Sequence, residues 1–180
     1  NVDRVVFGKG SLSHLSRIVE DCRQQLTGRD ESDRVLFLVD DFFSSCPKMI
    51  ADLEVGANDL LEYVSTIEEP TTDGVDELVR SVVHSGLLKP VTIVGVGGGS
   101  TLDTTKALAN LLSNGGVASA YQGWDLVPEA AVHKIGVPTI SGTGAEASRT
   151  CVMKNPRTGL KLGMNSEHSV FDQLILDPNL

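Results

Sequence analysis

Apolar positions in the first half of the chain alternate between short continuous runs and longer runs with helical spacing. Continuous runs at residues 34–40, 60–65 and 90–96, with a shorter one at 3–8, predict strands. Spaced runs that begin near residues 11, 42, 71 and 100 predict helices. Strands that are apolar on both faces belong in a parallel sheet with helices on both sides. The alternation therefore predicts an α/β, Rossmann-like domain, a parallel sheet flanked by helices and built from right-handed βαβ units.

Small and polar residues indicate where these elements begin and end. Ser11 stands where it could cap the first helix, and the Asn-Gly-Gly sequence at 114–116 predicts the end of the helix that opens at Ser100 or Thr101. The polar stretch at 27–33 predicts a loop. After residue 114 the pattern weakens, and we expect a surface loop at 121–128, a short strand from about 133, a Gly/Thr-rich turn, and strand-like runs near the end.

Composition places the chain among ordinary globular domains. Its 180 residues are 41% hydrophobic and 22% charged, which suits one domain spanning residues 1–180. No apolar run approaches the roughly 20 residues that cross a bilayer, and the first ten residues lack a signal-peptide pattern. The three cysteines have no CxxC spacing, which is typical of free thiols. We therefore expect a cytoplasmic protein without a membrane partner.

The charge of the chain bears on its partners. A formal net charge of -9 without any Lys/Arg cluster argues against a nucleic-acid partner. A small phosphorylated ligand is compatible with this charge, because backbone amides at a helix N-terminus can hold it locally.

The stretch "VGVGGGSTLD" at residues 94–103 is the strongest candidate for such a site. A strand, then Gly97, Gly98 and Gly99, then a helix from Ser100 would let a pyrophosphate approach unpaired backbone amides. The pattern matches neither GxGxxG nor GxxxxGK[ST]. Ser100 and Asp103 also fit a capping arrangement. Tight packing of strand against helix is the alternative reason for the glycines.

Two further segments could complete a nucleotide site. Asp40 ends an apolar strand, where a carboxylate can accept hydrogen bonds from a ribose diol and repel a 2′-phosphate, unless it is only a solvated residue at a strand end. The turn at 138–149 offers the hydroxyls of Thr139, Ser141 and Thr143. Its alternative is a plain polar loop before a helix.

Taken together, three stretches resemble the iron-containing (group III) alcohol dehydrogenase family. They are "GVGGGSTLDTTKALA", "PTISGTGAEAS" and "TGLKLG…LILDPNL", where the family reads roughly GGGS-x-x-D-x-x-K, PTTAGTGSE and ILDP-E-L. The N-terminal "FGKGSLSHL" is also similar, so the resemblance spans nearly the whole chain. "YQGWDL" and "SGTGAE" further resemble a subgroup that oxidises C8 of the sugar acid 3-deoxy-manno-octulosonate.

The resemblance implies roles for ten residues. Gly97, Gly98, Gly99 and Ser100 would hold the pyrophosphate of NAD, with NADP also possible, and Asp40 would hold the adenosine ribose. Thr139, Ser141 and Thr143 would line the nucleotide. Lys161 would approach the nicotinamide-side ribose, and Asp103 would lie near the pyrophosphate and nicotinamide. For Asp103 the alternative is a helix residue favoured by the helix dipole.

The resemblance also implies a metal site that lies outside this chain. The family binds a divalent metal, iron, with one aspartate and three histidines of a C-terminal all-helical domain, which we expect this chain to lack. In the family the metal eases loss of the alcohol proton while hydride passes to the nicotinamide. Of the histidines here, His168 with Asp172 has the i, i+4 spacing of a metal pair, but solvated or structural roles are favoured.

Several functions remain open at this point. The chain is expected to be the dinucleotide-binding part of an alcohol dehydrogenase whose substrate is a small alcohol or a sugar acid. The alternatives are a non-catalytic nucleotide-binding or assembly module from a truncated gene, and a related lyase or glycerol dehydrogenase. An uncovered apolar face would favour a homo-oligomer.

Overall fold

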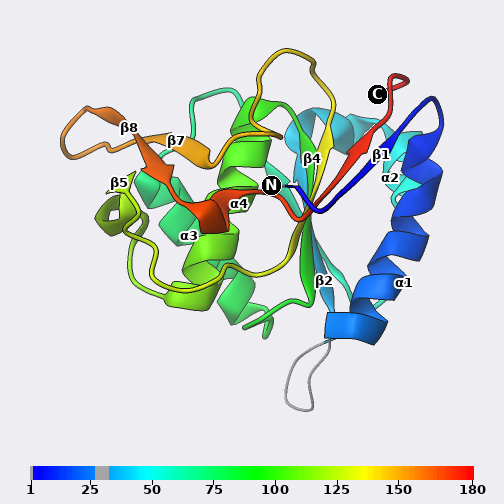
Figure 1. Ribbon diagram of the computed structural model, residues 1–180, viewed down its shortest axis with the longest axis horizontal. Coiled ribbons are helices and arrows are strands. Elements are labelled where there is room, and N and C mark those ends of the chain that lie inside the picture. Colours follow the sequence, from blue (N-terminus) through cyan, green and yellow to red (C-terminus); the bar gives the residue numbers. More distant parts are fainter. Residues whose placement is uncertain (1, 27–32) are drawn as a thin grey trace.

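A single parallel sheet forms the centre of the molecule (Figure 1). The computed structural model describes residues 2–26 and 33–180, so nearly all of the loop predicted at 27–33 lies outside the described residues. The strands run in the order β1-β9-β6-β4-β2-β3, and every pair is parallel. Their bounds are β1 Arg4–Phe7, β2 Val35–Asp40, β3 Leu60–Val64, β4 Thr92–Gly97, β6 Lys134–Pro138 and β9 Gln173–Leu176.

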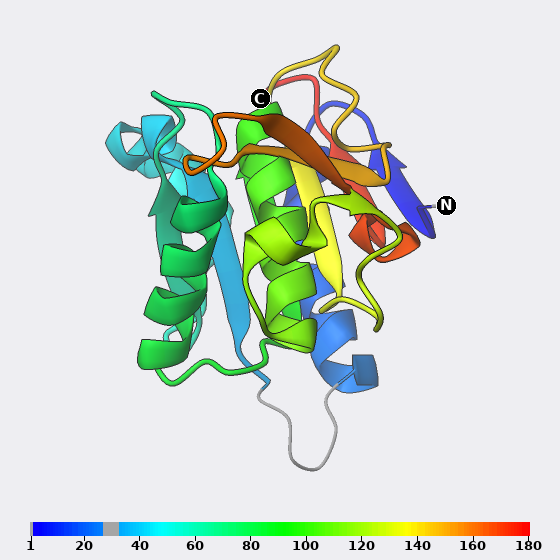
Figure 2. The same ribbon diagram turned by 90° about the vertical axis from the view of Figure 1, so that its left-hand side faces the viewer.

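Helices cover both faces of this sheet, which confirms the predicted α/β class. Helices α1 (Leu15–Leu26) and α2 (Pro47–Asp52) lie on one face. Helices α3 (Thr72–His84) and α4 (Gly99–Asn114) lie side by side on the other (Figure 2). Short 3₁₀ helices lie at Ser11–His14, Asp41–Ser45, Ala118–Tyr121 and Glu167–Ser169.

Strand β2 shows why the continuous apolar runs are strands. Val35, Phe37 and Val39 pack in the core under α1, while Leu36 and Leu38 pack in the core under α3 and α4. All five are at most 1% exposed. Successive side chains of a strand point to opposite faces, so a strand covered on both sides must be apolar throughout.

A second, smaller sheet lies over α4, on the side away from the main sheet (Figures 1 and 2). It contains β5 (Gly123–Trp124), β8 (Lys161–Asn165) and β7 (Thr150–Lys154), in that order, with β7 and β8 antiparallel. Cys151, Met153 and Met164 bury their side chains beneath it. The sequence predicts strand character near β8 but not this hairpin, because β7 directly follows a polar, glycine-rich turn.

The first helix begins differently from the prediction. Ser11 makes no capping hydrogen bond, Gly10 is the cap residue with a φ of 79°, and a 3₁₀ turn precedes α1. The carboxylate of Asp177 accepts the amides of Gly10 and Leu12, both at 3.0 Å, from across the sheet edge. Burial alone would raise the pKa of Asp177, but hydrogen bonds from Leu12, Asn179 and Gly10 lower it. The cap is therefore supplied from the "LDP" stretch, more than 160 residues away.

Two other helix predictions need correction. The helix expected from residue 42 is split into a 3₁₀ turn at Asp41–Ser45 and α2, because Pro47 cannot continue a helix but suits a first turn. Helix α4 begins after Gly98 without any side-chain cap, so Ser100 and Asp103 do not form the expected capping arrangement. Its end is as predicted, since Gly115 follows Asn114 with a φ of 67°.

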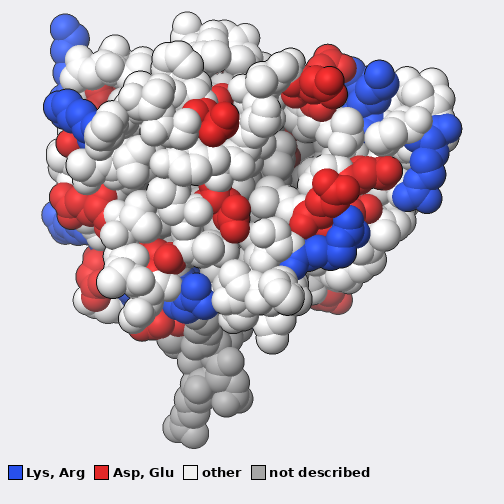
Figure 3. Space-filling view, turned by 180° about the vertical axis from the view of Figure 1, so that it is seen from behind, with Lys and Arg blue, Asp and Glu red and all other residues white. Residues whose placement is uncertain are grey.

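The surface and the helix lengths bear on the expected partners. On the face shown in Figure 3, acidic and basic side chains are interspersed and form no continuous basic patch. None of the helices within the described residues combines the length and apolarity needed to span a bilayer.

Candidate dinucleotide site

The three segments singled out in the sequence meet at one edge of the main sheet. Strands β6, β4 and β2 are neighbours and parallel, so Pro138, Gly97 and Asp40 at their carboxyl ends lie next to one another. The amide of Thr139 donates to the carbonyl of Gly97 at 3.0 Å. Thr101 Oγ1 donates to Asp40 Oδ2 at 3.3 Å. Topology therefore brings Asp40 to the glycine turn although it precedes the turn in the sequence.

The glycines of this segment allow two different neighbours to come close to the backbone, the helix α4 and the 139–150 loop. A Cβ on Gly95 would lie 2.3 Å from Thr105 Oγ1, and one on Gly97 would lie 2.5 Å from Thr101 Oγ1. These two glycines let α4 pack directly against β4, so the packing explanation holds for them. A Cβ on Gly98 would instead meet the Cδ1 end of Ile140 at 2.9 Å.

Gly99 and Ser100 form the first turn of α4, where the backbone is most open. Both are half-buried, and no side chain caps the amides of this turn. A Cβ on Gly99 would lie 3.2 Å from Thr143 Cβ, so the second turn lies directly over the first. Uncapped amides at a helix N-terminus carry partial positive charge and suit an anion.

Asp40 is held firmly within the fold. It is 9% exposed, which rules out the alternative of a solvated residue at a strand end. Its carboxylate accepts the amide of Phe42 at 3.0 Å and the hydroxyl of Thr66 at 3.1 and 3.2 Å, besides that of Thr101. A carboxylate offers about four lone-pair directions, so acceptor capacity remains for a ligand hydroxyl.

The second turn lies over the first and carries the predicted hydroxyls. Thr139 is half-buried, whereas Ser141 and Thr143 are exposed. Thr143 Oγ1 lies 3.4 Å from Glu146 Oε2 and accepts the amide of Ala145 at 3.4 Å. The turn leads into β7, so the helix expected after it is wrong.

Sequence reasoning missed Lys106, whose ammonium binds the carbonyl of Ala145 in this second turn. Its side chain is fully buried on α4, and its ammonium donates to the carbonyls of Ala145, Ser148 and Thr150. Lysine is almost never fully buried without partners. Lys106 occupies the final position of the GGGS-x-x-D-x-x-K pattern, and that was the signal that could have identified it.

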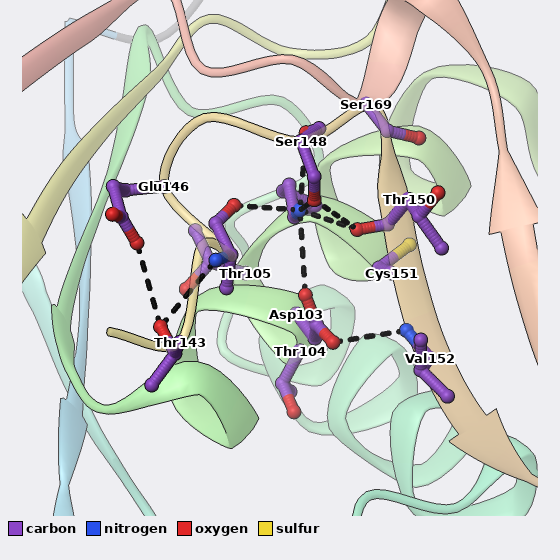
Figure 4. Close-up of polar contacts among 12 residues, drawn as sticks. Asp103, Thr104, Thr105, Thr143, Glu146, Ser148, Thr150, Cys151, Val152 and Ser169 are labelled. Carbon is purple, nitrogen blue, oxygen red and sulfur yellow. Dashed lines mark hydrogen bonds and ion pairs between the residues drawn. The ribbon is translucent and has the colours of Figure 1, made fainter. Parts of the chain in front are cut away.

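Asp103, one turn earlier on α4, faces the same cluster. Its Oδ2 accepts the amide of Val152 at 3.0 Å, and its Oδ1 lies 3.3 Å from Lys106 Nζ (Figure 4). Burial raises the pKa of the Asp103 carboxyl, and the charge of Lys106 opposes this only in part. Oδ2 therefore binds the protein backbone, whereas the buried Oδ1 faces the Lys106 charge without accepting a hydrogen bond. Its predicted role near the cofactor stays a prediction.

Lys161 lies on β8 and is exposed. Its ammonium pairs with the Glu69 carboxylate, and this hydrogen bond lowers the pKa of Glu69. A cavity of about 540 Å³ is lined by Glu69, Ser100 and Thr104, among others. Lys161 is also near enough to Asp103 to lower the pKa of that carboxyl. The lysine thus lies within electrostatic range of Asp103 near the start of α4, with its charge engaged by Glu69.

Large apolar side chains are exposed around this edge. Each follows or ends a strand of the main sheet: Phe7 (75% exposed), Phe42 (71%), Ile67 (92%) and Ile140 (59%). A cavity of about 550 Å³ lies beside Phe7 and Ile140, and one of about 410 Å³ beside Phe42 and Ile67. The carboxyl edge therefore offers the apolar, partly concave surface expected at a ligand site or a covered face.

The described residues do not supply a metal site. Within 2–26 and 33–180, no group of three or more His, Cys, Asp or Glu side chains is arranged to hold a metal ion. Asp172, half of the spaced pair considered in the sequence, instead accepts the amide of Lys134 at 2.8 Å. This confirms a structural role for Asp172.

Known proteins resemble the chain in sequence and fold. Sulfoacetaldehyde reductase of Bilophila wadsworthia is 39% identical over 66% of this chain and 30% of its own length. The 1-propanol dehydrogenase PduQ of Citrobacter freundii is 26% identical over 98% of this chain and 41% of its own. The crystal structure of sulfoacetaldehyde reductase from Bifidobacterium kashiwanohense in complex with NAD⁺ superimposes with a TM-score of 0.78, at 22% identity, over 98% of this chain and 44% of that one.

The chain thus spans less than half the length of these proteins. The family model described as iron-containing alcohol dehydrogenase matches residues 3–178. The match confirms the resemblance noted in the sequence, and the chain belongs to the iron-containing alcohol dehydrogenase family of oxidoreductases.

Proposed function

We propose that this chain is the dinucleotide-binding part of an NAD-dependent alcohol dehydrogenase. It binds NAD across the carboxyl edge of the sheet and orients the nicotinamide for hydride exchange with an alcohol. The observation that carries this proposal is the direct contact of Asp40, the Gly97–Ser100 turn and the Thr139–Thr143 turn at one edge.

Each part of the dinucleotide has a partner of suitable chemistry. The pyrophosphate binds the uncapped amides of Gly99 and Ser100 next to Gly98. The adenosine ribose donates its hydroxyls to Asp40. The hydroxyls of the Thr139–Thr143 turn line the nucleotide. Lys161 leaves Glu69 to reach the nicotinamide-side ribose, and Asp103 lies near the pyrophosphate and nicotinamide.

The fixed carboxylate of Asp40 favours NAD over NADP. Its oxygens are held by Phe42, Thr66 and Thr101, so the side chain cannot turn away from a 2′-phosphate. A second negative charge placed there would be repelled at close range.

This chain performs only part of the reaction. A bound divalent metal would polarise the alcohol, but the described residues do not fit a ligand set for iron. The steps that the chain performs itself are binding the dinucleotide and fixing its orientation. The names of the relatives point to small alcohols and aldehydes as substrates. A sugar acid, suggested by "YQGWDL", is a narrower prediction for the substrate. For the oligomeric state, we expect a homo-oligomer that covers the exposed side chains of Phe7 and Ile140.

Calorimetric titration with NAD and NADP tests the proposal. We expect the unmodified protein to bind NAD more tightly, and Asp40→Asn to shift the ratio toward NADP by about tenfold, or about 1.4 kcal/mol. Asparagine keeps the shape of the Asp40 side chain and most of its hydrogen bonds, whereas alanine would remove them. Asp41→Asn is the matched control, since it removes one charge from the exposed neighbouring residue and should leave the ratio unchanged. The proposal would be overturned if the unmodified protein bound NADP more tightly than NAD, or if it bound neither nucleotide.

A further inference from the structure

Two lysines are buried in this domain, and they lie in different surroundings. Lys134 is 3% exposed and begins β6 at the amino edge, where Nζ lies 3.4 Å from Asp172 Oδ2. Lys106 is fully buried in α4 and makes most of its contacts with the backbone of one loop. Burying a lysine costs stability unless its charge is paired and its donors are used, so both sites need a reason.

The hydrogen bonds of the Lys106 ammonium all go to residues 145–150. Its ammonium donates to Ala145 O at 2.9 Å, to Ser148 O at 3.3 Å and to Thr150 O. Ser148 Oγ lies 3.2 Å from Nζ and itself donates to Thr150 O at 3.1 Å. The Lys106 ammonium thus binds three carbonyls of one irregular segment.

Asp103 completes the arrangement from the preceding turn of α4. It balances the Lys106 charge at 3.3 Å and accepts the amide of Val152, the central residue of β7. Residues i and i+3 of a helix lie on one face, so the pair holds the segment at two places.

The segment held in this way continues directly from the turn that lies over the glycines. A Cβ atom added to Gly99 would meet the Thr143 side chain, and one added to Gly98 would meet the Ile140 side chain. The hydroxyls of Ser141 and Thr143 are exposed, and few main-chain hydrogen bonds fix this turn, Ala147 to Gly144 being one. Its position over the glycine turn therefore depends on the anchor that follows it.

We propose that Lys106 is a positioning residue that fixes the 139–150 loop over the glycine turn, and that dinucleotide affinity depends on this loop being fixed. The inference rests on the proposed function, since it concerns the same site. Lys106 touches no nucleotide; it acts through the carbonyls of Ala145, Ser148 and Thr150.

The test compares Lys106→Met with Lys134→Met. Methionine keeps the length and apolar stem of lysine and removes its donors in both places. We expect Lys106→Met to speed amide hydrogen exchange in 141–152 by about tenfold or more in the protein without nucleotide, and to weaken NAD binding by about tenfold. Lys134→Met should lower the melting temperature but leave both readouts unchanged, because it lies at the opposite edge.

Ser148→Ala is the second variant, needed in case Lys106→Met does not fold. It removes one contact with the ammonium and one with Thr150 O, so it should raise exchange and the dissociation constant in the same direction by a smaller factor.

Three outcomes are decisive. Unchanged exchange in 141–152 in Lys106→Met, or in Ser148→Ala if only that variant folds, would overturn the inference. Equal loss of NAD affinity in Lys106→Met and Lys134→Met, at equal loss of stability, would also overturn it, because the effect would then be general. Failure of the unmodified protein to bind either dinucleotide would overturn the proposed function, while the exchange measurement would still decide whether Lys106 fixes the loop.

Discussion

The two edges of the main sheet both carry buried polar side chains, but they use them differently. At the amino edge, Asp59 accepts Arg23 Nη2 at 2.7 Å and the amides of Val35 and Gly56 at 2.9 and 3.0 Å. Asp172 likewise holds the amide and ammonium of Lys134. These groups bond to one another and to the starts of the strands, so they close that end of the fold.

At the carboxyl edge the polar groups remain partly open. Asp40 retains acceptor capacity, the first turn of α4 has no side-chain cap, and the hydroxyls of Ser141 and Thr143 are exposed. Several cavities border this edge, and each includes residues that directly follow a strand of the main sheet. A hollow also exists at the amino edge, but it lies between Asp33 and Asp59, far from the glycine turns. The difference teaches that the polar residues before the strands, such as Asp59, serve the fold. After the strands, Asp177 serves the fold in the same way, whereas Asp40 keeps acceptor capacity at the edge where ligands of parallel sheets bind.

Asp59→Ala tests the amino edge and should have the largest effect on stability. The side chain of Asp59 is 3% exposed, and its removal leaves the amides of Val35 and Gly56 and the guanidinium of Arg23 without their acceptor. We expect the free energy of unfolding to fall by about 3 kcal/mol, measured by chemical denaturation. NAD affinity of the folded protein should be unchanged. A large loss of affinity at temperatures where the variant is folded would break the distinction between the edges.

Gly98→Ala tests the carboxyl edge, where we expect a loss of binding with little loss of stability. The added Cβ meets only the free end of the exposed Ile140 side chain, which can move. A pyrophosphate bound against the Gly98 backbone could not move away from the added methyl group. The dissociation constant for NAD should therefore rise about tenfold, which corresponds to a loss of about 1.4 kcal/mol in binding free energy.

The double variant Gly98→Ala/Ile140→Ala separates ligand from loop. It removes the Ile140 atoms that the new Cβ would contact. If the nucleotide needs the space, binding stays weak in the double variant. Recovery of affinity would mean that Gly98 serves only the packing of the 139–150 loop.

The sequence predicted the main sheet well, because its strands and helices carry strong local signals. Continuous apolar runs and spaced apolar runs follow directly from burial on two faces or one, as in β2 and α3. The same local signals misplaced the cap of the first helix, because the acceptor is Asp177 and the contact joins distant parts of the chain. No local pattern around Ser11 contains that information.

For the candidate site, the sequence identified the segments but not how they are held. Asp40 and the two glycine-rich turns stand out by residue type, and parallel topology explains why they meet. Lys106 did not stand out, since a lysine in an amphipathic helix is ordinarily solvated. Its burial follows from the β7–β8 sheet packing over α4, an element that the polar sequence before Thr150 gave no reason to expect.

His133 supports the smallest predicted effect, a pH dependence confined to the amino edge. Its Nδ1 lies 2.8 Å from Thr92 Oγ1. Burial lowers the pKa of His133 and the charge of Lys134 adds to this, while Asp172 and Asp3 oppose it. The unfolded chain therefore takes up a proton near pH 6.5, where the folded chain remains neutral. Stability contributed by the neutral ring is present above that pH and is lost as the pH falls through the folded pKa.

Denaturation curves between pH 5 and 8 measure this contribution. We expect His133→Asn, whose amide can replace the contact of Nδ1 with Thr92, to flatten the decline in stability below about pH 6.5. NAD affinity over the same range should be identical in the two proteins, because His133 precedes β6 and the nucleotide turns follow it. A pH-dependent affinity that the substitution abolishes would show that the two edges are coupled through β6, and a slope unchanged by the substitution would show that other groups titrate there.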